Sequence, residues 1–133
     1  MTPELTARIL VVDDDPYFLR VISRILSGES FQVTTAEGAS QATQILKEHT
    51  FDIVISDLRL PDGDGLSILQ QARSAGLEVP VVILTAYGEV DSYLEAMNAG
   101  VTEYLNKPVK SEELIAVVRS CLQARAPSPE ATP

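Results

Sequence analysis

The sequence contains a single cysteine, Cys121, and no apolar run approaching the roughly eighteen residues of a membrane span. A lone cysteine cannot form an internal disulfide, which fits a reducing, cytoplasmic compartment. The first residues lack the basic start and apolar stretch of a signal peptide. Basic residues are also scarce, since 10 lysines and arginines accompany 19 aspartates and glutamates, for a formal net charge of −9. Nucleic-acid binding depends on basic side chains, so we predict no nucleic-acid partner. Because the sequence has no apolar run long enough for a membrane span, we predict no membrane partner either.

The composition is that of one globular domain. The chain has 133 residues, of which 45% are apolar and 22% charged, so it can build one hydrophobic core and is no collagen, coiled coil or wholly disordered chain. We expect a domain at 8–124, preceded by a short extension at 1–7. The proline-bearing segment 125–133 has no apolar period, so we expect a flexible tail or the start of a linker there.

Strand-like and helix-like segments alternate along the chain. Apolar runs rich in β-branched residues predict buried strands at 9–12, 53–55 and 79–84, with weaker candidates at 31–35 and 102–105. Apolar residues at helical spacing predict helices at 16–27, 39–47, 65–74, 89–98 and 111–123. Five strand-helix repeats with short connections predict a doubly wound α/β domain, in which helices cover both faces of a parallel sheet.

Charged and hydroxyl side chains follow the predicted strands. Asp13 and Asp14 come after the first strand, and Asp57 after the third. Thr85 follows the fourth strand and Lys107 the fifth. Ligands of open parallel sheets bind outside the carboxyl ends of the strands, so we expect these five side chains to converge at one edge.

Neighbouring acids have simpler explanations. Asp15 precedes Pro16 and a predicted helix, which suits an N-cap. Asp62 and Asp64 lie among prolines and glycines, and we interpret them as turn residues.

The converging residues suit phosphoryl chemistry. Crowded carboxylates repel one another unless a cation offsets their charge, and a carboxylate-oxygen site suits Mg²⁺. Lys107 adds a compact positive charge that can contact a carboxylate and a phosphoryl oxygen, and Thr85 adds a hydroxyl donor. A carboxylate beside a metal, a lysine and a hydroxyl is typical of an aspartyl-phosphate site.

Four separated motifs resemble those of the response-regulator receiver domains of two-component signalling. They are ILVVDDDP at 9–16, IVISDLRLPDGDG at 53–65, VVILTA at 81–86 and YLNKP at 104–108. The resemblance covers roughly residues 8–124. It implies a chemotaxis-regulator-like (βα)₅ fold of the flavodoxin-like type, with strand order 2-1-3-4-5.

The resemblance also implies roles at the phosphoryl site. Asp57 matches the phosphoacceptor, Asp14 the direct Mg²⁺ ligand, and Asp13 the neighbouring acid that reaches the metal largely through water. The backbone carbonyl of Arg59 matches the third protein ligand. The Arg59 side chain also flanks the expected phosphoryl group, and Thr85 matches the switch hydroxyl.

Further positions follow from the same motifs. Lys107 matches the family's site lysine, and the bond to Pro108 is expected to be cis. Tyr104 matches the aromatic switch position. Ala86 matches the small residue that lets the phosphoryl group approach, and Tyr87 flanks that group.

The function implied is a signalling switch rather than an enzyme with separate substrates. By the resemblance, Asp57 would take a phosphoryl group from a phosphohistidine of a sensor histidine kinase or histidine phosphotransfer domain. The domain would catalyse only its own Mg²⁺-dependent phosphorylation and dephosphorylation. The face formed by the fourth helix, fifth strand and fifth helix would then change. That face would control a partner, a downstream output domain or a phosphorylation-dependent dimer.

Three alternative functions compete with the signalling switch. A haloacid-dehalogenase-type phosphatase is disfavoured, because such enzymes place a second acid where this chain has Arg59. A flavodoxin-like electron carrier is also disfavoured, because the acids at 13–15 would repel the phosphate of FMN. An interaction module that works without phosphorylation stays open. The sequence names neither the kinase nor the output, and is compatible with a single-domain regulator or part of a longer protein.

Overall fold

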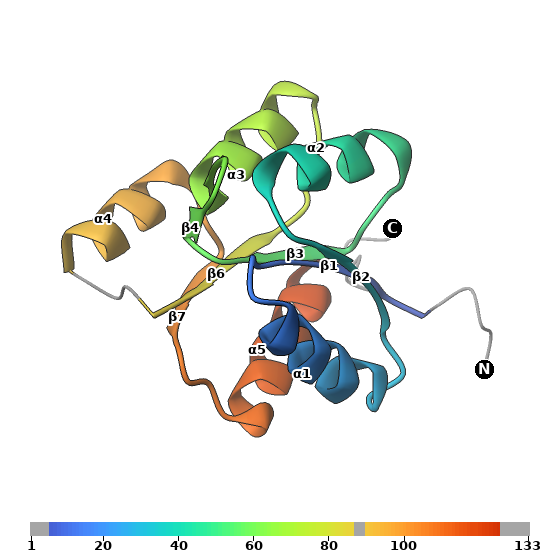
Figure 1. Cartoon of the computed structure of the whole chain (residues 1–133). Coiled ribbons are helices and arrows are strands. Elements are labelled where there is room, and N and C mark those ends of the chain that lie inside the picture. Colours follow the sequence, from blue (N-terminus) through green and yellow to red (C-terminus); the bar gives the residue numbers. More distant parts are fainter. Residues whose placement is uncertain (1–5, 87–89, 126–133) are drawn as a thin grey trace, which may run out of the picture.

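A five-stranded parallel sheet lies at the centre of the computed structural model, which describes residues 6–86 and 90–125. Its strands are β1 (Arg8–Val12), β2 (Gln32–Ala36), β3 (Ile53–Ser56), β6 (Val81–Thr85) and β7 (Glu103–Asn106). They lie in the order β2-β1-β3-β6-β7, with β2 at one edge and β7 at the other (Figure 1). With only these strands numbered, the order is 2-1-3-4-5, which confirms the predicted topology.

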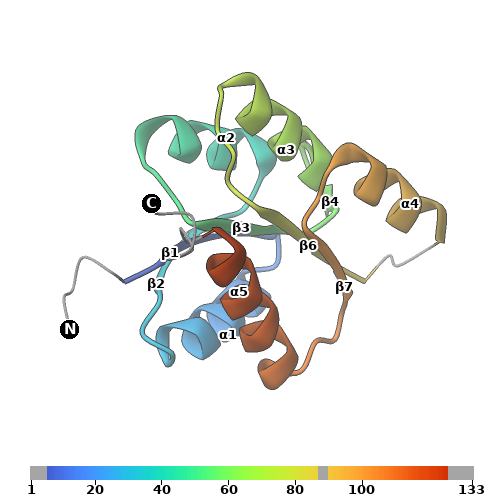
Figure 2. The ribbon, with the colours of Figure 1, turned by 180° about the vertical axis from the view of Figure 1, so that it is seen from behind.

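Helices cover both faces of the sheet. They are α1 (Pro16–Ser27), α2 (Ala39–Glu48), α3 (Gly65–Ser74), α4 (Val90–Ala99) and α5 (Ser111–Arg125). Figures 1 and 2 show α1 and α5 on one face and α2, α3 and α4 on the other. The doubly wound arrangement is therefore confirmed. No helix in the described part of the chain has the length and apolar character needed to cross a membrane.

The central strands bury both of their faces. Leu10 and Val12 of β1 belong to the apolar cluster beneath α2, α3 and α4, whereas Ile9 and Val11 pack with α1 and α5. All four residues are at most 1% exposed. Burial on both sides explains why these strands appear in the sequence as continuous apolar runs rather than as an alternating pattern.

A short antiparallel hairpin follows β3 and was not predicted. Its strands, β4 (Arg59–Leu60) and β5 (Gly63–Asp64), pair apart from the main sheet. Two-residue strands show no periodicity, and the segment is full of turn-forming residues. The hairpin matters because it begins two residues after Asp57.

The ends of the other elements lie within two residues of their predicted positions. The largest shift at a strand start is in β6, which begins at Val81 rather than at 79. Pro80 has no N–H to donate to a sheet, although its carbonyl accepts a hydrogen bond from the Val54 amide at 2.9 Å.

The expected domain boundaries stay predictions. Residues 1–5 and 126–133, which make up most of the two expected terminal segments, lie outside the described residues. Tyr87 lies outside them as well. At its described end, α5 continues to Arg125, one residue past the expected boundary.

Candidate functional site

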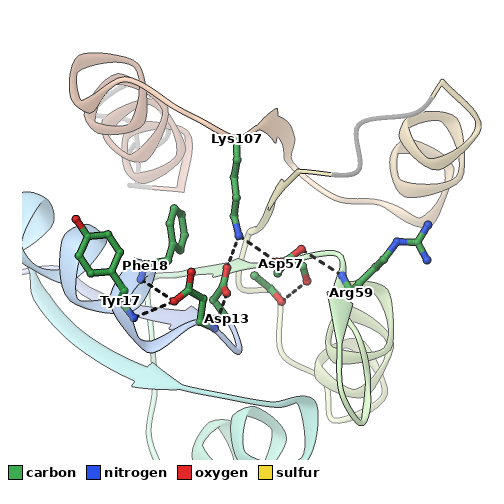
Figure 3. A network of polar contacts seen from close by, with 8 residues as sticks. Asp13, Tyr17, Phe18, Asp57, Arg59 and Lys107 are labelled. Atoms are coloured by element: carbon green, nitrogen blue, oxygen red, sulfur yellow. Dashed lines mark hydrogen bonds and ion pairs between the residues drawn. The ribbon is translucent and has the colours of Figure 1, made fainter.

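Asp13 and Asp57 lie side by side at the carboxyl ends of two neighbouring strands (Figure 3). β1 pairs with β3 up to Val12 and Ser56, and the Asp57 amide continues this pattern by donating to the Val12 carbonyl at 2.9 Å. The Asp13 amide donates to the Ala36 carbonyl of β2 at 3.0 Å. Their side chains are only 2% and 8% exposed. Backbone pairing thus places two buried carboxylates next to each other.

Lys107 connects these carboxylates from the end of β7. Its Nζ donates to Asp13 Oδ2 at 2.6 Å and to Asp57 Oδ2 at 3.1 Å. The Lys107 amide donates to the Thr85 carbonyl at 2.8 Å, which ties the ends of β6 and β7 together. The ammonium also lies 4.1 Å from the centre of the Phe18 ring, in a cation–π contact with α1. One ammonium is therefore held between two carboxylates and an aromatic ring.

Burial and charge have opposite effects on the pKa values at this site. Burial raises the pKa of the Asp13 carboxyl, and hydrogen bonds from Lys107 and the Asp15 amide offset only part of that effect. Burial alone lowers the pKa of the Lys107 ammonium, but its hydrogen bonds and charge interactions with Asp13 and Asp57 outweigh burial and raise it. Lys107 is therefore held in its charged form, whereas hydrogen bonds and nearby positive charge offset only part of the cost of burying the Asp13 carboxylate.

A third carboxylate completes an acidic cluster. Carboxylate oxygens of Asp13, Asp14 and Asp57 lie within 4.8 Å of one another. The first and last residues are buried, whereas Asp14 is exposed, so solvent reaches one side of the cluster. In the part of the chain that the structure describes, the Lys107 ammonium pairs with two of these three carboxylates. Hard oxygen donors with excess negative charge suit Mg²⁺. The donor set thus fits the predicted ion.

The site lies inside a match to a known family. Residues 9–119 match the family model of the response regulator receiver domain. The chain belongs to this family. It is a receiver domain of two-component response regulators, as the four motifs predict, and such domains are signalling switches.

Relatives and solved structures agree with this assignment. The receiver domain is 39% identical over 124 residues to the alginate biosynthesis transcriptional regulatory protein AlgB of Pseudomonas aeruginosa. It is 34% identical over 122 residues to the transcriptional regulatory protein GlrR of Escherichia coli. These alignments cover 93% and 92% of this chain but 28% of each relative. The chain therefore spans little more than a quarter of the curated relatives it matches.

Two solved structures share the fold. A receiver domain from Clostridium thermocellum superposes with a TM-score of 0.84 and 31% identity, covering 90% of this chain and 96% of that one. The beryllofluoride-activated NtrC4 receiver domain dimer gives a TM-score of 0.84 and 28% identity, covering 90% and 98%. The whole α/β domain is thus shared, rather than one motif.

The other predicted site positions surround Asp57. The Arg59 amide donates to Asp57 Oδ1 at 3.3 Å, while the Arg59 side chain points away from the carboxylate (Figure 3). Thr85 is fully buried at the end of β6, and Ala86 after it is exposed. The peptide bond that precedes Pro108 is cis.

Tyr104, the predicted switch residue, belongs to β7, and its ring contacts α4. It is half-buried and packs against the apolar cluster on the α2, α3 and α4 side of the sheet. Its ring meets Tyr93 of α4 edge-on, with ring centres 5.5 Å apart. Tyr93 is 45% exposed, so the contact between the two rings connects the sheet to the surface of the domain.

Sequence reasoning missed two residues that shape the site. A Cβ at Gly65 would lie 2.9 Å from the Asp57 carbonyl oxygen and 2.5 Å from Ile83 Cδ1, so only glycine lets α3 begin this close. The glycine was visible in the sequence, but its closeness to Asp57 was not. Phe18 falls within the helix predicted at 16–27, but nothing in the sequence places its ring against Lys107.

Proposed function

We propose that this receiver domain accepts a phosphoryl group on Asp57 from a phosphohistidine of a sensor histidine kinase or a histidine phosphotransfer domain. The observation that carries the proposal is the nearly buried Asp57 carboxylate, 3.1 Å from the Lys107 ammonium and within an acidic cluster that fits Mg²⁺. Buried like charges cost stability unless a counter-ion offsets them. Phosphoryl transfer uses this combination of a carboxylate, an ammonium and a metal ion.

In the proposed transfer, an Asp57 oxygen attacks the phosphorus in line. The bond from phosphorus to the donor's imidazole nitrogen breaks, and its electron pair leaves with the imidazole. Lys107 stands beside the negative charge that develops on the phosphoryl oxygens. When bound by Asp14, Asp57 and the Arg59 carbonyl, and by Asp13 through water, Mg²⁺ supplies further neutralisation of those oxygens.

The same site would also return the domain to its starting state. Hydrolysis of the aspartyl phosphate needs a water in line with phosphorus. By the family resemblance, Ala86 leaves room for the phosphoryl group, and longer side chains at the positions of Arg59 and Tyr87 would slow the approach of water. The Arg59 side chain points away from the Asp57 carboxylate in this structure, so it would have to turn towards the phosphoryl group to act in this way. We propose that self-phosphorylation and this hydrolysis are the only reactions the domain catalyses.

Replacing Asp14 by alanine is expected to weaken Mg²⁺ binding by about tenfold or more, because affinity follows the number of charged ligands. Asp14 is exposed, so the fold should persist. Isothermal titration calorimetry measures the affinity. Asp15→Asn is the matched control, because asparagine also caps helices well and should leave affinity unchanged. Equal affinities for Asp14→Ala and the parent would remove Asp14 from the ligand set.

Phosphorylation would be read out through Thr85 and Tyr104. We propose that the buried Thr85 hydroxyl moves towards the phosphoryl group and that Tyr104 turns inward into the space released. Because Tyr104 contacts Tyr93 of α4, this turn would alter the α4–β7–α5 face. The change is a shift between two populated states, driven by their different contacts with the phosphoryl group.

Replacing Thr85 by alanine should therefore preserve phosphoryl uptake but abolish most of the conformational response. Backbone chemical shifts of α4, β7 and α5, recorded with and without phosphorylation, measure that response. Thr102→Ala, at an exposed threonine just before β7, should respond like the parent. Identical shift changes in Thr85→Ala and the parent would show that the hydroxyl does not couple site and surface.

The switched face would act on an output. The relatives AlgB and GlrR are transcriptional regulatory proteins that extend far beyond the length matched here, which supports a downstream output domain or partner. On α4, Tyr93, Leu94 and Met97 are 45%, 52% and 38% exposed. This apolar surface, together with the activated NtrC4 dimer, supports a phosphorylation-dependent dimer through α4–β7–α5. We place this switch in the cytoplasm, as its single cysteine suggests.

The function is tested by intact mass after incubation with Mg²⁺ and either a small acyl phosphate or a phosphohistidine-bearing phosphotransfer domain. We expect a gain of one phosphoryl group, lost when Mg²⁺ is chelated. No gain from either donor would contradict the proposal and favour an interaction module that works without phosphorylation.

A further inference from the structure

Asp62, which the sequence suggested to be a turn residue, contacts a helix outside its own loop. It sits in the connection between β4 and β5, where Oδ1 accepts a hydrogen bond from the Ala39 amide at 2.7 Å. Oδ2 accepts one from the Ser40 amide at 2.9 Å. These are the first two residues of α2. The carboxylate therefore caps α2 from a segment more than twenty residues away in sequence.

The start of α2 is shaped to receive this carboxylate. The N-cap residue of α2 is Gly38, which makes no side-chain capping bond. A Cβ at Gly38 would lie 2.9 Å from Asp62 Oδ1. The backbone there is extended, with φ −160°, a conformation open to any residue, so glycine serves to leave space. The amides of Ser40 and Ala39 lower the pKa of Asp62, which keeps it ionised.

The other end of this connection is the phosphoryl site. Within the hairpin, Arg59 pairs with Asp64 and Leu60 with Gly63. One contact between the hairpin and Asp57 is the Arg59 amide bond to Oδ1, whose 3.3 Å length is slightly above the usual range for such bonds. The Gly65 amide also donates to the Leu58 carbonyl at 3.0 Å, which closes the hairpin segment next to Asp57. The hairpin is therefore held near Asp57 by these backbone bonds and at its turn by the bonds from α2 to Asp62.

We propose that Asp62 is a positioning residue for the metal and phosphoryl site, acting by anchoring the β4–β5 hairpin to α2 and so fixing the Arg59 carbonyl beside Asp57. The inference rests on the proposed function of Asp57 and extends it. Asp62 touches neither metal nor phosphoryl group. Its effect passes through two charge-assisted hydrogen bonds at one end of the hairpin and the Arg59 backbone at the other.

A pair of variants separates anchoring from helix capping. Asp62→Ala removes both the anchor and the cap of α2. Adding Gly38→Ser restores a cap within the helix itself, because serine suits an extended N-cap and the space is free once the carboxylate is gone. The double variant therefore has a capped α2 but an unanchored hairpin. Glu37→Gln removes one exposed negative charge nearby and is the control for charge alone.

Two measurements are made on each folded protein: the urea midpoint and the Mg²⁺ affinity by calorimetry. We expect Asp62→Ala to lower the midpoint and to weaken Mg²⁺ binding about tenfold, as for other residues that orient ligands. The double variant should regain the midpoint but keep the weak affinity, and Glu37→Gln should match the parent. Recovery of both properties in the double variant, or parental affinity in Asp62→Ala, would overturn the proposal.

Mg²⁺ binding and phosphoryl uptake by the parent protein show whether a failure concerns the role of Asp62 or the proposed function. If the parent neither binds Mg²⁺ nor gains a phosphoryl group, the proposed function fails, and the role of Asp62 fails with it. If the parent does both and the Asp62 variants bind Mg²⁺ equally well, only the role of Asp62 is wrong.

Discussion

Asp57→Asn is expected to abolish phosphoryl uptake from an acyl phosphate while leaving the domain folded. Asparagine has nearly the shape of aspartate, but its amide is no nucleophile towards phosphorus. Its side-chain oxygen can still accept the hydrogen bond from the Arg59 amide. Lys107 keeps its shorter contact with Asp13, at 2.6 Å. Because one of the mutually repelling acids is removed, the free energy of unfolding should stay within about 1–2 kcal/mol of the parent.

Intact mass and urea unfolding on the same samples test both halves of this expectation. Asp64→Asn is the matched control, because Asp64 lies in the same segment and accepts a hydrogen bond from the Ser67 amide that asparagine can also accept. The control should gain one phosphoryl group. A phosphoryl group on Asp57→Asn would place the acceptor elsewhere, and an unfolded Asp57→Asn would show that this carboxylate is primarily structural.

The convergence of the site could be predicted because strand ends are easy to locate in this sequence. Buried parallel strands give continuous apolar runs, so the residue after each run is evident without a structure. Parallel strands bring those residues to one edge. Asp13, Asp57 and Lys107 are accordingly found together, although β7 lies far from β1 in sequence.

Contacts that depend on loops and side chains could not be predicted in this way. Asp62 looks like any acid in a turn, and its partners in α2 are defined only once the hairpin packs against that helix. The contact between Phe18 and Lys107 depends on the relative placement of α1 and β7. Both contacts join segments that are far apart in sequence, and the order of residue types along the chain does not show which of these segments meet.

Lys107→Met should destabilise the metal-free domain by about 3 kcal/mol, the second large effect we expect. The side chains of Asp13 and Asp57 are 2% and 8% exposed, and Lys107 is their shared cationic partner at 18% exposure. Removing one member of a buried ion pair leaves an uncompensated charge, which typically costs about 3–5 kcal/mol. Because Asp14 opens the cluster to solvent, the lower end applies. Added Mg²⁺ should recover part of the loss, since it binds only the folded site.

The pH dependence distinguishes lost charge compensation from lost packing against Phe18. Burial already raises the pKa of Asp13 above its unfolded value, and without Lys107 it should rise further. An acid with a raised folded pKa favours the fold most below its unfolded pKa, and that stability is lost as pH rises through the folded pKa. The difference in unfolding free energy between the parent and Lys107→Met should therefore narrow as the pH falls from neutrality towards the unfolded pKa of Asp13. Urea unfolding with a chelator, beside Lys110→Met as the exposed control, measures this difference. A constant difference across that pH range would assign the loss to packing instead.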